Sequence, residues 1–301
     1  MENYIDPFIR YLYEEAKDEK TLTAYRTTVV HFLKWKVARD GDYIIEETRP
    51  IDIKEYTTYL KHQCKRKPAT INKYIAALKV FFAFLFDKGL VKDNPMTRIK
   101  METLEYANGT NEAKWLTKEE QDRFISYAQL EPNEFKRLRN LAIIDLMLYA
   151  GLRVHEVSSL EINDIITKEK DFEVTIREGK GSKFAVVFLV HKHAKNLRKW
   201  LKYRKGLEKK IHNESTRLFV SERSMFLSER GIQKMLNKYA QLANMENITP
   251  HRFRHSFCKN LANAGTPIEI IRKLARHESI QTTAIYVDSS QEEQIEALKK
   301  M

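Results

Sequence analysis

The stretch TPHRFRHSFCKNLANAG, residues 249–265, places two histidines and two arginines within five consecutive positions. If the stretch is helical, His251, Arg254 and His255 share one face, because they lie three and four residues apart. A cluster of this kind suits three uses: binding of a metal ion, a solvated surface charge, or binding of an anion.

The composition of this stretch argues against a metal ion. Zinc proteases carry H-E-x-x-H on a helix, and Arg252 stands where their first glutamate would be. The stretch contains no Asp or Glu, and its arginines would repel a cation. A planar guanidinium group matches phosphate oxygens, and the start of a helix favours anions. We therefore predict no metal, a phosphate site at His251 and Arg254, and a buried structural role for His255.

Other positions offer matching chemistry. Arg153 follows a glycine at a helix start in YAGLRVHEVSSL, and Glu156 lies one turn on, where a carboxylate could orient a buried arginine. Lys180 lies in REGKGSK, which lacks the frame of a nucleotide-binding loop and reads either as a plain hairpin turn or as a lysine held in a cleft. His277 and Tyr286 lie nine residues apart in RHESIQTTAIYV. Taken alone, this tyrosine reads as a packing residue, because the chain has 14 tyrosines.

The composition favours a polyanionic partner. The 301 residues carry 53 Lys and Arg against 41 Asp and Glu, a net charge of +12, as in many nucleic-acid-binding proteins. A merely basic protein is the alternative. Two cysteines without CxxC spacing indicate a reducing compartment. No apolar run approaches the roughly 20 residues that span a bilayer, and the acidic N-terminus is unlike a signal peptide. We expect a cytoplasmic protein outside the membrane.

The first hundred residues predict a compact four-helix domain. Apolar residues recur at helical spacing through residues 5–17 and 20–39. Asp52 is expected to cap a third helix. Pro68 suits the start of a fourth helix, and Gly89 its end.

The helical periodicity lapses between residues 100 and 113, where turn-forming residues gather at 108–111. We therefore predict a first domain of residues 1–107, a linker of residues 108–114, and a second domain of residues 115–301.

The second domain is expected to be mostly helical with a small antiparallel sheet. Thr117 and Glu120 form a capping box that opens a helix, and Gly151 ends a long apolar helix. Residues 171–190 alternate about a glycine-rich turn, which predicts a β-hairpin. The further helices are expected at residues 191–203, 229–242, 250–264, 267–274 and 291–300.

These pieces together resemble the tyrosine recombinase, or phage integrase, family. The family order R…K…H-x-x-R…H…Y is matched, in sequence, by Arg153, Lys180, His251, Arg254, His277 and Tyr286. The stretches TLTAYRTTVVHFLKW and PATINKYIAALKVFFAFLFDKGL are similar to the SAM-like core-binding domain of Xer-type recombinases. The resemblance covers nearly the whole chain. It implies a mainly α fold: a four-helix core-binding domain followed by a mixed α/β catalytic domain.

The resemblance implies a site-specific recombinase that cleaves and rejoins DNA without a metal, ATP or another cofactor. Tyr286 would attack a DNA phosphodiester, giving a 3′-phosphotyrosyl link and a free 5′-hydroxyl. Arg153, Arg254 and His277 would stabilise the charge of the transition state.

Three further residues take supporting roles in this scheme. Lys180 would protonate the leaving 5′-oxygen, as the general acid of the family does. His251 would assist as an acid/base or as a phosphate donor. Glu156 would orient the first arginine of the pocket.

The implied partner is double-stranded DNA carrying core recombination sites. Contacts to DNA are expected from a basic helix start, for which a solvated charge run is the alternative, and from two arginines near the catalytic positions. These residues are Lys65, Arg66, Lys67, Thr70, Lys73, Arg252 and Arg276. At the last of these positions the family usually has glycine, so a phosphate contact and a solvent-facing side chain both stay open.

The helix expected at residues 291–300 would dock on a neighbouring protomer, giving a homo-tetramer on two DNA sites. Two alternatives remain beside the recombinase. One is a DNA-relaxing enzyme resembling type IB topoisomerases, and the other is an inactive DNA-binding relative.

Overall fold

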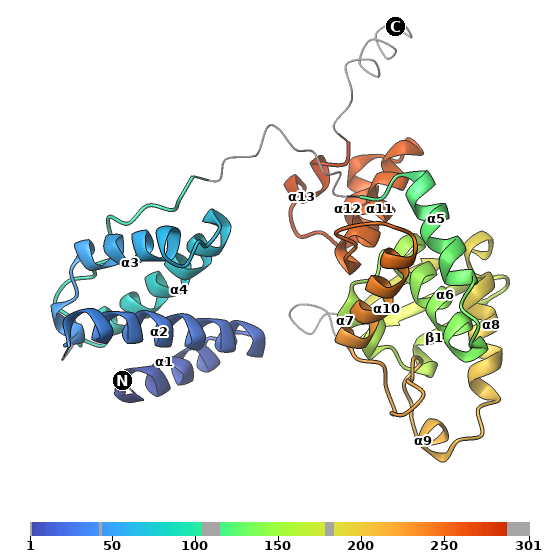
Figure 1. Ribbon diagram of the computed structural model, residues 1–301, viewed down its shortest axis with the longest axis horizontal. Helices are drawn as coiled ribbons and strands as arrows, with labels where there is room; N and C mark the ends of the chain where they lie inside the picture. Colours follow the sequence, from blue (N-terminus) through green and yellow to red (C-terminus); the bar gives the residue numbers. More distant parts are fainter. Residues whose placement is uncertain (1, 42–43, 104–114, 178–183, 288–301) are drawn as a thin grey trace, which may run out of the picture. The chain divides into compact units, whose positions relative to one another are not determined.

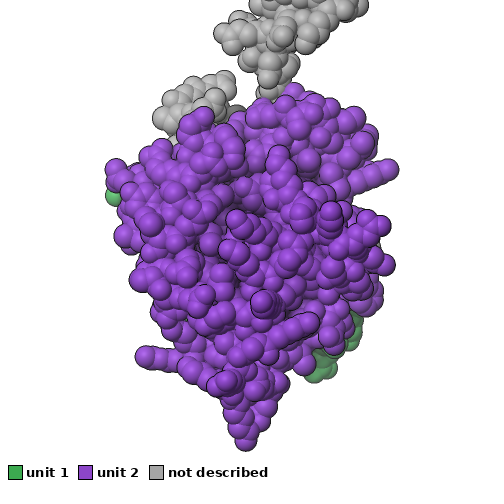
Figure 2. Space-filling model, turned by 90° about the vertical axis from the view of Figure 1, so that its right-hand side faces the viewer, with its two compact units in different colours: residues 1–110 green, residues 111–301 purple. Residues whose placement is uncertain are grey.

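A computed structural model describes residues 2–41, 44–103, 115–177 and 184–287 of the chain (Figure 1). The chain divides into two compact units, Met1–Thr110 and Asn111–Met301 (Figure 2). The division falls inside the range expected for the linker. The described part is mostly helical, with a small antiparallel sheet in the second unit, as the sequence predicted.

The described part of the first unit holds four α-helices. They are α1 (Glu2–Glu14), α2 (Glu19–Asp40), α3 (Pro50–His62) and α4 (Pro68–Asp87), with a 3₁₀ turn at Ile45–Glu47. Their apolar faces meet in a core of edge-packed rings. Phe8 contacts Phe81 with ring centres 5.0 Å apart, and Phe32 contacts Tyr56 at 5.1 Å. The predicted four-helix unit is thus observed.

The ends of α4 lie where the sequence predicted them. Pro68 is its first residue, and Gly89 follows its end in the left-handed region at φ +68°. Asp52 caps α3 as predicted, but it does so from the third helical position, because α3 begins two residues earlier, at Pro50. Proline suits the first helical position since no amide donor is needed there. The Asp52 carboxylate accepts the amide of the N-cap residue, Arg49, at 2.7 Å, and it also pairs with buried Lys36 at 2.5 Å.

Helix α4 corrects another expectation. By length and composition alone it is long and apolar enough to cross a membrane, although no such run was expected from the sequence. In the structure, 44% of its most apolar window is buried within the unit. Its buried stripe includes Ile71, Ile75 and Leu78. Its apolar character is explained by its place in the core.

The second unit is built around α6 (Glu134–Tyr149), which packs against four other helices (Figure 1). These are α5 (Lys118–Gln129), α7 (Val154–Ser159), α8 (Lys195–Lys205) and α11 (Pro250–Asn263). The remaining helices of its described part are α9 (Lys210–Asn213), α10 (Glu229–Leu242), α12 (Ile268–Ala275) and α13 (Gln281–Ala284). The predicted capping box opens α5: the Glu120 amide donates to the Thr117 hydroxyl at 3.2 Å, and the Thr117 amide donates to the Glu120 carboxylate at 2.8 Å.

Gly151 ends the central helix, as predicted, and turns the chain into α7. Its φ of +65° is in the left-handed region that favours glycine. A Cβ at this position would lie 2.5 Å from a ring carbon of Phe257. Arg153 follows two residues later as the N-cap of α7. The glycine turn therefore brings this arginine close to α11.

The sheet has three antiparallel strands in the order β1 (Ile165–Lys168), β2 (Asp171–Ile176) and β3 (Ala185–Leu189). In this register Val174 lies opposite both Ile165 and Val187. The predicted hairpin of β2 and β3 is confirmed. Strand β1 was not predicted, because four residues are too few to show an alternating pattern. Lys180 lies outside the described residues.

Several helix bounds differ from the predictions. Residues 191–193 form a 3₁₀ turn, so α8 begins at Lys195 instead of residue 191 and runs on to Lys205. Helix α12 covers Ile268–Ala275, a shift of one residue at each end. The four-residue helices α9 and α13 were not predicted, since each is too short for periodicity. The helix expected at residues 291–300 lies outside the described residues.

Replacement of Gly151 by alanine should destabilise the second unit more than the same change at Gly265, which also has positive φ. Alanine at either position adopts a disfavoured backbone conformation, at a cost of about 1 kcal/mol. Only at Gly151 does the new Cβ meet a side chain, while nothing lies within 4 Å of it at Gly265. Overpacking adds about 1–3 kcal/mol. Urea unfolding of both variants checks this, and equal losses would contradict the close packing at Gly151.

Candidate active site

Arg153 and Glu156 form an ion pair at the start of α7. The Arg153 Nη1 atom donates to Glu156 Oε1 at 2.9 Å, and the Arg153 backbone amide donates to Oε2 at 2.7 Å. The carboxylate is buried, while the arginine side chain is one-third exposed. Burial alone would raise the pKa of Glu156. The charges of Arg276 and Arg153, with the amide hydrogen bond, outweigh burial and hold this pKa below its usual value. The pair is therefore ionised.

Arg276 shares the same carboxylate. Its Nη2 atom donates to Glu156 Oε2 at 2.7 Å, and its side chain is only 15% exposed. Its backbone carbonyl accepts a hydrogen bond from Arg153 Nη2 at 3.3 Å. The sequence left two orientations open for this side chain, a phosphate contact and a solvent-facing position. In the structure the side chain does not face solvent. One carboxylate thus holds two arginines.

Arg254, on α11, lies behind this pair and is buried. Its guanidinium donates to the carbonyls of Gly151 and Ala275, which lie just beyond the end of α6 and at the end of α12. Helix C-termini carry partial negative charge and so suit a cation. Burial lowers the pKa of Arg254 to about 10, and the charges of Arg153 and Arg276 lower it in the same direction. The side chain is still ionised at neutral pH.

Tyr286 is almost wholly buried, with an exposed fraction of 1%. Its hydroxyl is hydrogen-bonded to Nδ1 of His255 and lies against the thiol of Cys258. Lys259 Nζ donates to its backbone carbonyl at 3.2 Å. Burial raises the pKa of the phenol, and Cys258 raises it further. In the described conformation the phenol is protonated and shielded from solvent.

His277 packs beside Tyr286, with ring centres 6.2 Å apart. Its Nδ1 atom lies 3.0 Å from the hydroxyl oxygen of Thr283, so the two are hydrogen-bonded. Burial lowers the pKa of His277 to about 4, and Arg254 and Arg153 lower it in the same direction. The imidazole is therefore neutral at pH 7.

The structure thus brings together five of the residues that sequence reasoning singled out. They are Arg153, Glu156, Arg254, His277 and Tyr286, joined by Arg276 through its contact with the carboxylate. His251 is exposed in the first turn of α11. Lys180, outside the described residues, has no placement here.

His255 and Arg252 differ from what the sequence led us to expect. The buried structural role for His255 was too simple, because the ring is only partly buried and bonds the Tyr286 hydroxyl. The Arg252 guanidinium turns inward and donates to the carbonyls of Trp115 at 3.1 Å and Glu246 at 3.2 Å. His255 lies four residues after His251, and this helical spacing could have indicated that His255 lies near the site.

Residues around Tyr286 were missed altogether. The Trp115 ring lies 6.3 Å from the Tyr286 ring, and Lys259 Nζ lies 5.1 Å from the centre of the Trp115 ring. Cys258 and Thr283 contact Tyr286 and His277 from α11 and α13. No spacing rule in the sequence marks these four residues, because their contacts arise only when the segments fold together.

The basic residues expected to contact DNA from the first unit lie around the start of α4. Lys65, Arg66 and Lys67 precede this helix and are exposed, and Lys73 is exposed within it. Thr70, in the first turn, is partly buried. The described surface there is positively charged and open.

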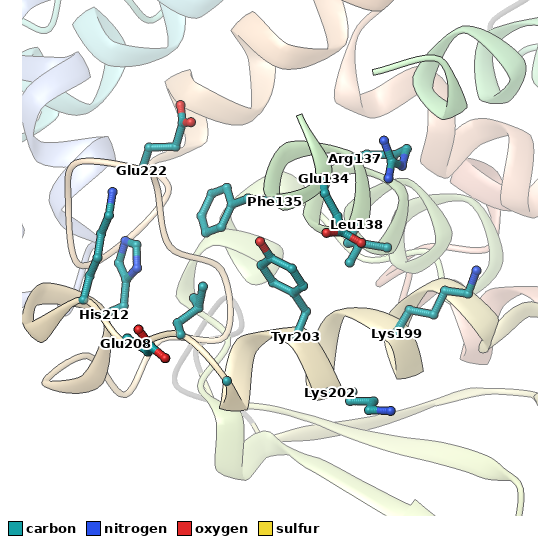
Figure 3. A pocket seen from close by; sticks show the side chains of 13 residues that line it. Glu134, Phe135, Arg137, Leu138, Lys199, Lys202, Tyr203, Glu208, His212 and Glu222 are labelled. Atoms are coloured by element: carbon teal, nitrogen blue, oxygen red, sulfur yellow. The ribbon is translucent and has the colours of Figure 1, made fainter. Parts of the chain in front are cut away.

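A hollow of about 810 Å³ lies elsewhere on the second unit (Figure 3). It is lined by Phe135 of α6, Tyr203 of α8, His212 of α9 and charged residues of both signs. None of the site residues named from the sequence lines this hollow. Among the described residues, no group of three or more His, Cys, Asp or Glu side chains is arranged to hold a metal ion.

The chemical character of the cluster is that of an anion site beside a phenol. Two guanidinium groups pair with the Glu156 carboxylate, and a third, that of Arg254, lies nearby, which leaves an excess of positive charge in a largely buried place. A phosphate group would compensate this excess through charge-assisted hydrogen bonds.

Comparisons with known proteins agree with this chemistry. Residues 114–293 match the phage integrase family, and residues 5–89 match the phage integrase N-terminal SAM-like domain. Tyrosine recombinase XerC of Leptospira interrogans is 29% identical over 297 residues, covering 97% of this chain and 91% of that protein. The TnP I resolvase of Bacillus thuringiensis is 30% identical over 289 residues, covering 94% of each.

Solved structures show the same fold. The XerA recombinase has a TM-score of 0.52 at 26% identity and covers 99% of this chain and 98% of its own. The Tn1549 transposon integrase bound to circular intermediate DNA has a TM-score of 0.74 at 19% identity and covers 98% of both chains. These findings support the recombinase prediction and lend no support to the topoisomerase-like alternative. The chain belongs to the phage integrase family of tyrosine recombinases, enzymes that cleave and rejoin DNA at specific sites.

Proposed function

We propose that Tyr286 is the nucleophile of this recombinase and forms a 3′-phosphotyrosyl link with DNA. The observation that carries the proposal is the position of this phenol beside His277 and the buried Arg254, next to the Arg153–Glu156 pair. A nucleophile and an anion site for its target are thus built from one group of elements, α7 and α11 to α13.

The reaction follows from the charges in this cluster. The phenolic oxygen of Tyr286 attacks the phosphorus, and the bond from phosphorus to the 5′-oxygen breaks. Negative charge grows on the non-bridging oxygens, which Arg153 and Arg254 stabilise by hydrogen bonds and charge. The neutral His277 ring adds a hydrogen bond. Attack of a 5′-hydroxyl from another duplex on the link reverses the step, so no ATP is needed.

Lys180 and His251 complete the proposed set on sequence grounds. Lys180 protonates the leaving 5′-oxygen, a role that the family order assigns to the hairpin lysine. His251, exposed at the start of α11, donates to the phosphate or takes part in proton transfer.

The buried state of Tyr286 sets a condition on cleavage. Its hydroxyl is shielded and its pKa is raised, so a phosphate reaches it only after the segment that carries it shifts. The Nδ1 atom of His255, hydrogen-bonded to this hydroxyl, is placed to accept the proton that the phenol must lose. We infer that DNA binding drives this shift.

The proposed substrate is double-stranded DNA with core recombination sites. The exposed basic residues at the start of α4 contact its backbone. The segment at residues 291–300 docks on a neighbouring protomer, which gives a homo-tetramer on two sites. The protein works in the cytoplasm, without a membrane partner.

Replacing Tyr286 with phenylalanine should abolish the covalent DNA adduct. The cleavage site is first mapped by sequencing genomic DNA fragments that become covalently attached to the wild-type protein. A nicked suicide substrate with that site then traps the link, which is counted on a denaturing gel. Phenylalanine fills the same space but has no oxygen to attack phosphorus. Undiminished adduct from Tyr286→Phe would show that another residue is the nucleophile.

Replacing Arg153 with alanine should slow cleavage of this substrate about 100- to 1,000-fold, the usual effect of losing one donor to transition-state charge. DNA affinity, measured by gel shift, should change little, because many other cations contact the duplex. Arg137→Ala is the matched control, because Arg137 lines the hollow of Figure 3, to which no site residue contributes. If Arg153→Ala loses binding and cleavage in equal measure, the transition-state role is wrong.

A further inference from the structure

Arg276 occupies a backbone position that suits glycine. It follows the end of α12 with φ +54° and ψ +47°, the left-handed conformation in which residues with a Cβ are disfavoured. Its amide donates to the Lys273 carbonyl, so the helix end itself is well formed. A glycine would close the helix without strain. The side chain is therefore present despite its backbone cost, which directs attention to what the guanidinium does.

The guanidinium has one strong contact and unused donors. Nη2 binds Glu156 at 2.7 Å, while Nε and Nη1 are buried without a hydrogen-bond partner in the described part of the chain. One buried arginine elsewhere in the second unit provides a contrast. Arg139 is also buried, and its Nε, Nη1 and Nη2 atoms all donate to oxygens of Asn140 and Val220. Hydrogen bonding alone thus does not account for the placement of Arg276.

The charge of Arg276 accounts for the placement of its side chain. Glu156 holds Arg153 through two hydrogen bonds, but an unopposed carboxylate there would offset the charge of that arginine and repel an incoming phosphate. Arg276 pairs with the same carboxylate oxygen that accepts the Arg153 amide. The group then keeps an excess of positive charge while Arg153 stays oriented.

We propose that Arg276 is a positioning residue for DNA cleavage, which neutralises Glu156 so that the charge of Arg153 acts fully on the scissile phosphate. The inference rests on the proposed function. Its carbonyl, 3.3 Å from Arg153 Nη2, adds a direct constraint on the same side chain. Arg276 thereby acts through Arg153 and Glu156 and needs no contact with DNA.

The test compares stability and cleavage in Arg276→Gly. Glycine removes the backbone strain, whereas loss of one partner of the buried Glu156 acts in the opposite direction, so urea unfolding is measured to ensure that the variant is folded where cleavage is assayed. Single-turnover cleavage of the suicide substrate, with protein in excess, should fall about tenfold, less than for loss of a direct donor. Arg276→Lys keeps the charge and should recover part of the rate. Asn244→Gly, which relieves a left-handed residue at the end of α10, should leave cleavage unchanged.

A second substrate separates charge from structure. Its scissile phosphate is replaced by a methylphosphonate, which has a methyl group for one non-bridging oxygen and carries no charge. The ratio of wild-type to Arg276→Gly rates should shrink towards one on this substrate, because the carboxylate no longer repels a charged group. A merely structural role would slow both substrates equally.

The outcomes distinguish the two proposals. Suppose that the wild-type protein cleaves its site, and Arg276→Gly either cleaves at the same rate or is slowed equally on both substrates. Either result overturns the role of Arg276 alone. A wild-type chain that forms no adduct on its mapped site overturns the proposed function, and this inference with it.

Discussion

The pairing of one buried carboxylate with two arginines is the interaction on which the candidate active site depends. Glu156 is 2% exposed, and an isolated charge at such depth would be strongly unfavourable. Arg153 and Arg276 remove that cost and hold the carboxylate ionised. The carboxylate in turn permits several like charges to share a small volume, which repulsion would otherwise oppose. The cluster is stable without a ligand and still carries the positive charge that a phosphate needs.

The scaffold supplies the remaining support through helix ends. The carbonyls of Gly151 and Ala275, after α6 and at the end of α12, accept hydrogen bonds from Arg254. The start of α7 presents Arg153, and its capping box supplies Glu156. Because α6 is the central helix of the second unit, these ends are fixed by the packing of the whole core. The residues that bind charge are thus held by elements of the core, whereas Tyr286 follows the four-residue helix α13.

Much of the fold was predictable from local features of the sequence. Gly151, Pro68 and the Thr117–Glu120 capping box set helix ends through backbone geometry, which acts within a few residues and so is visible in sequence. Asp52 shows the limit, because it caps α3 as predicted but from the third helical position, and its ion pair with Lys36 could not be predicted from local sequence. Elements of four residues, such as β1 and α13, carry no period and were missed.

The residue types of the site were predictable by family order, but their contacts were not. The bond between His255 and Tyr286 joins residues 31 positions apart, and the inward turn of Arg276 depends on where α7 lies. Both are set by how α11, α12 and the following segment pack, which no local pattern encodes. The family order therefore pointed to most of the residues that the structure brings together, while His255 was assigned to the core and the orientation of Arg276 was left open.

The central claim is that the phenol beside this arginine cluster forms the covalent link. The most direct measurement is mass spectrometry of the trapped adduct after digestion with nuclease and protease. The account predicts a nucleotide joined through its 3′-phosphate to the peptide that contains Tyr286, and a free 5′-hydroxyl on the released strand. A nucleotide on any other residue, or a link through a 5′-phosphate, would contradict it.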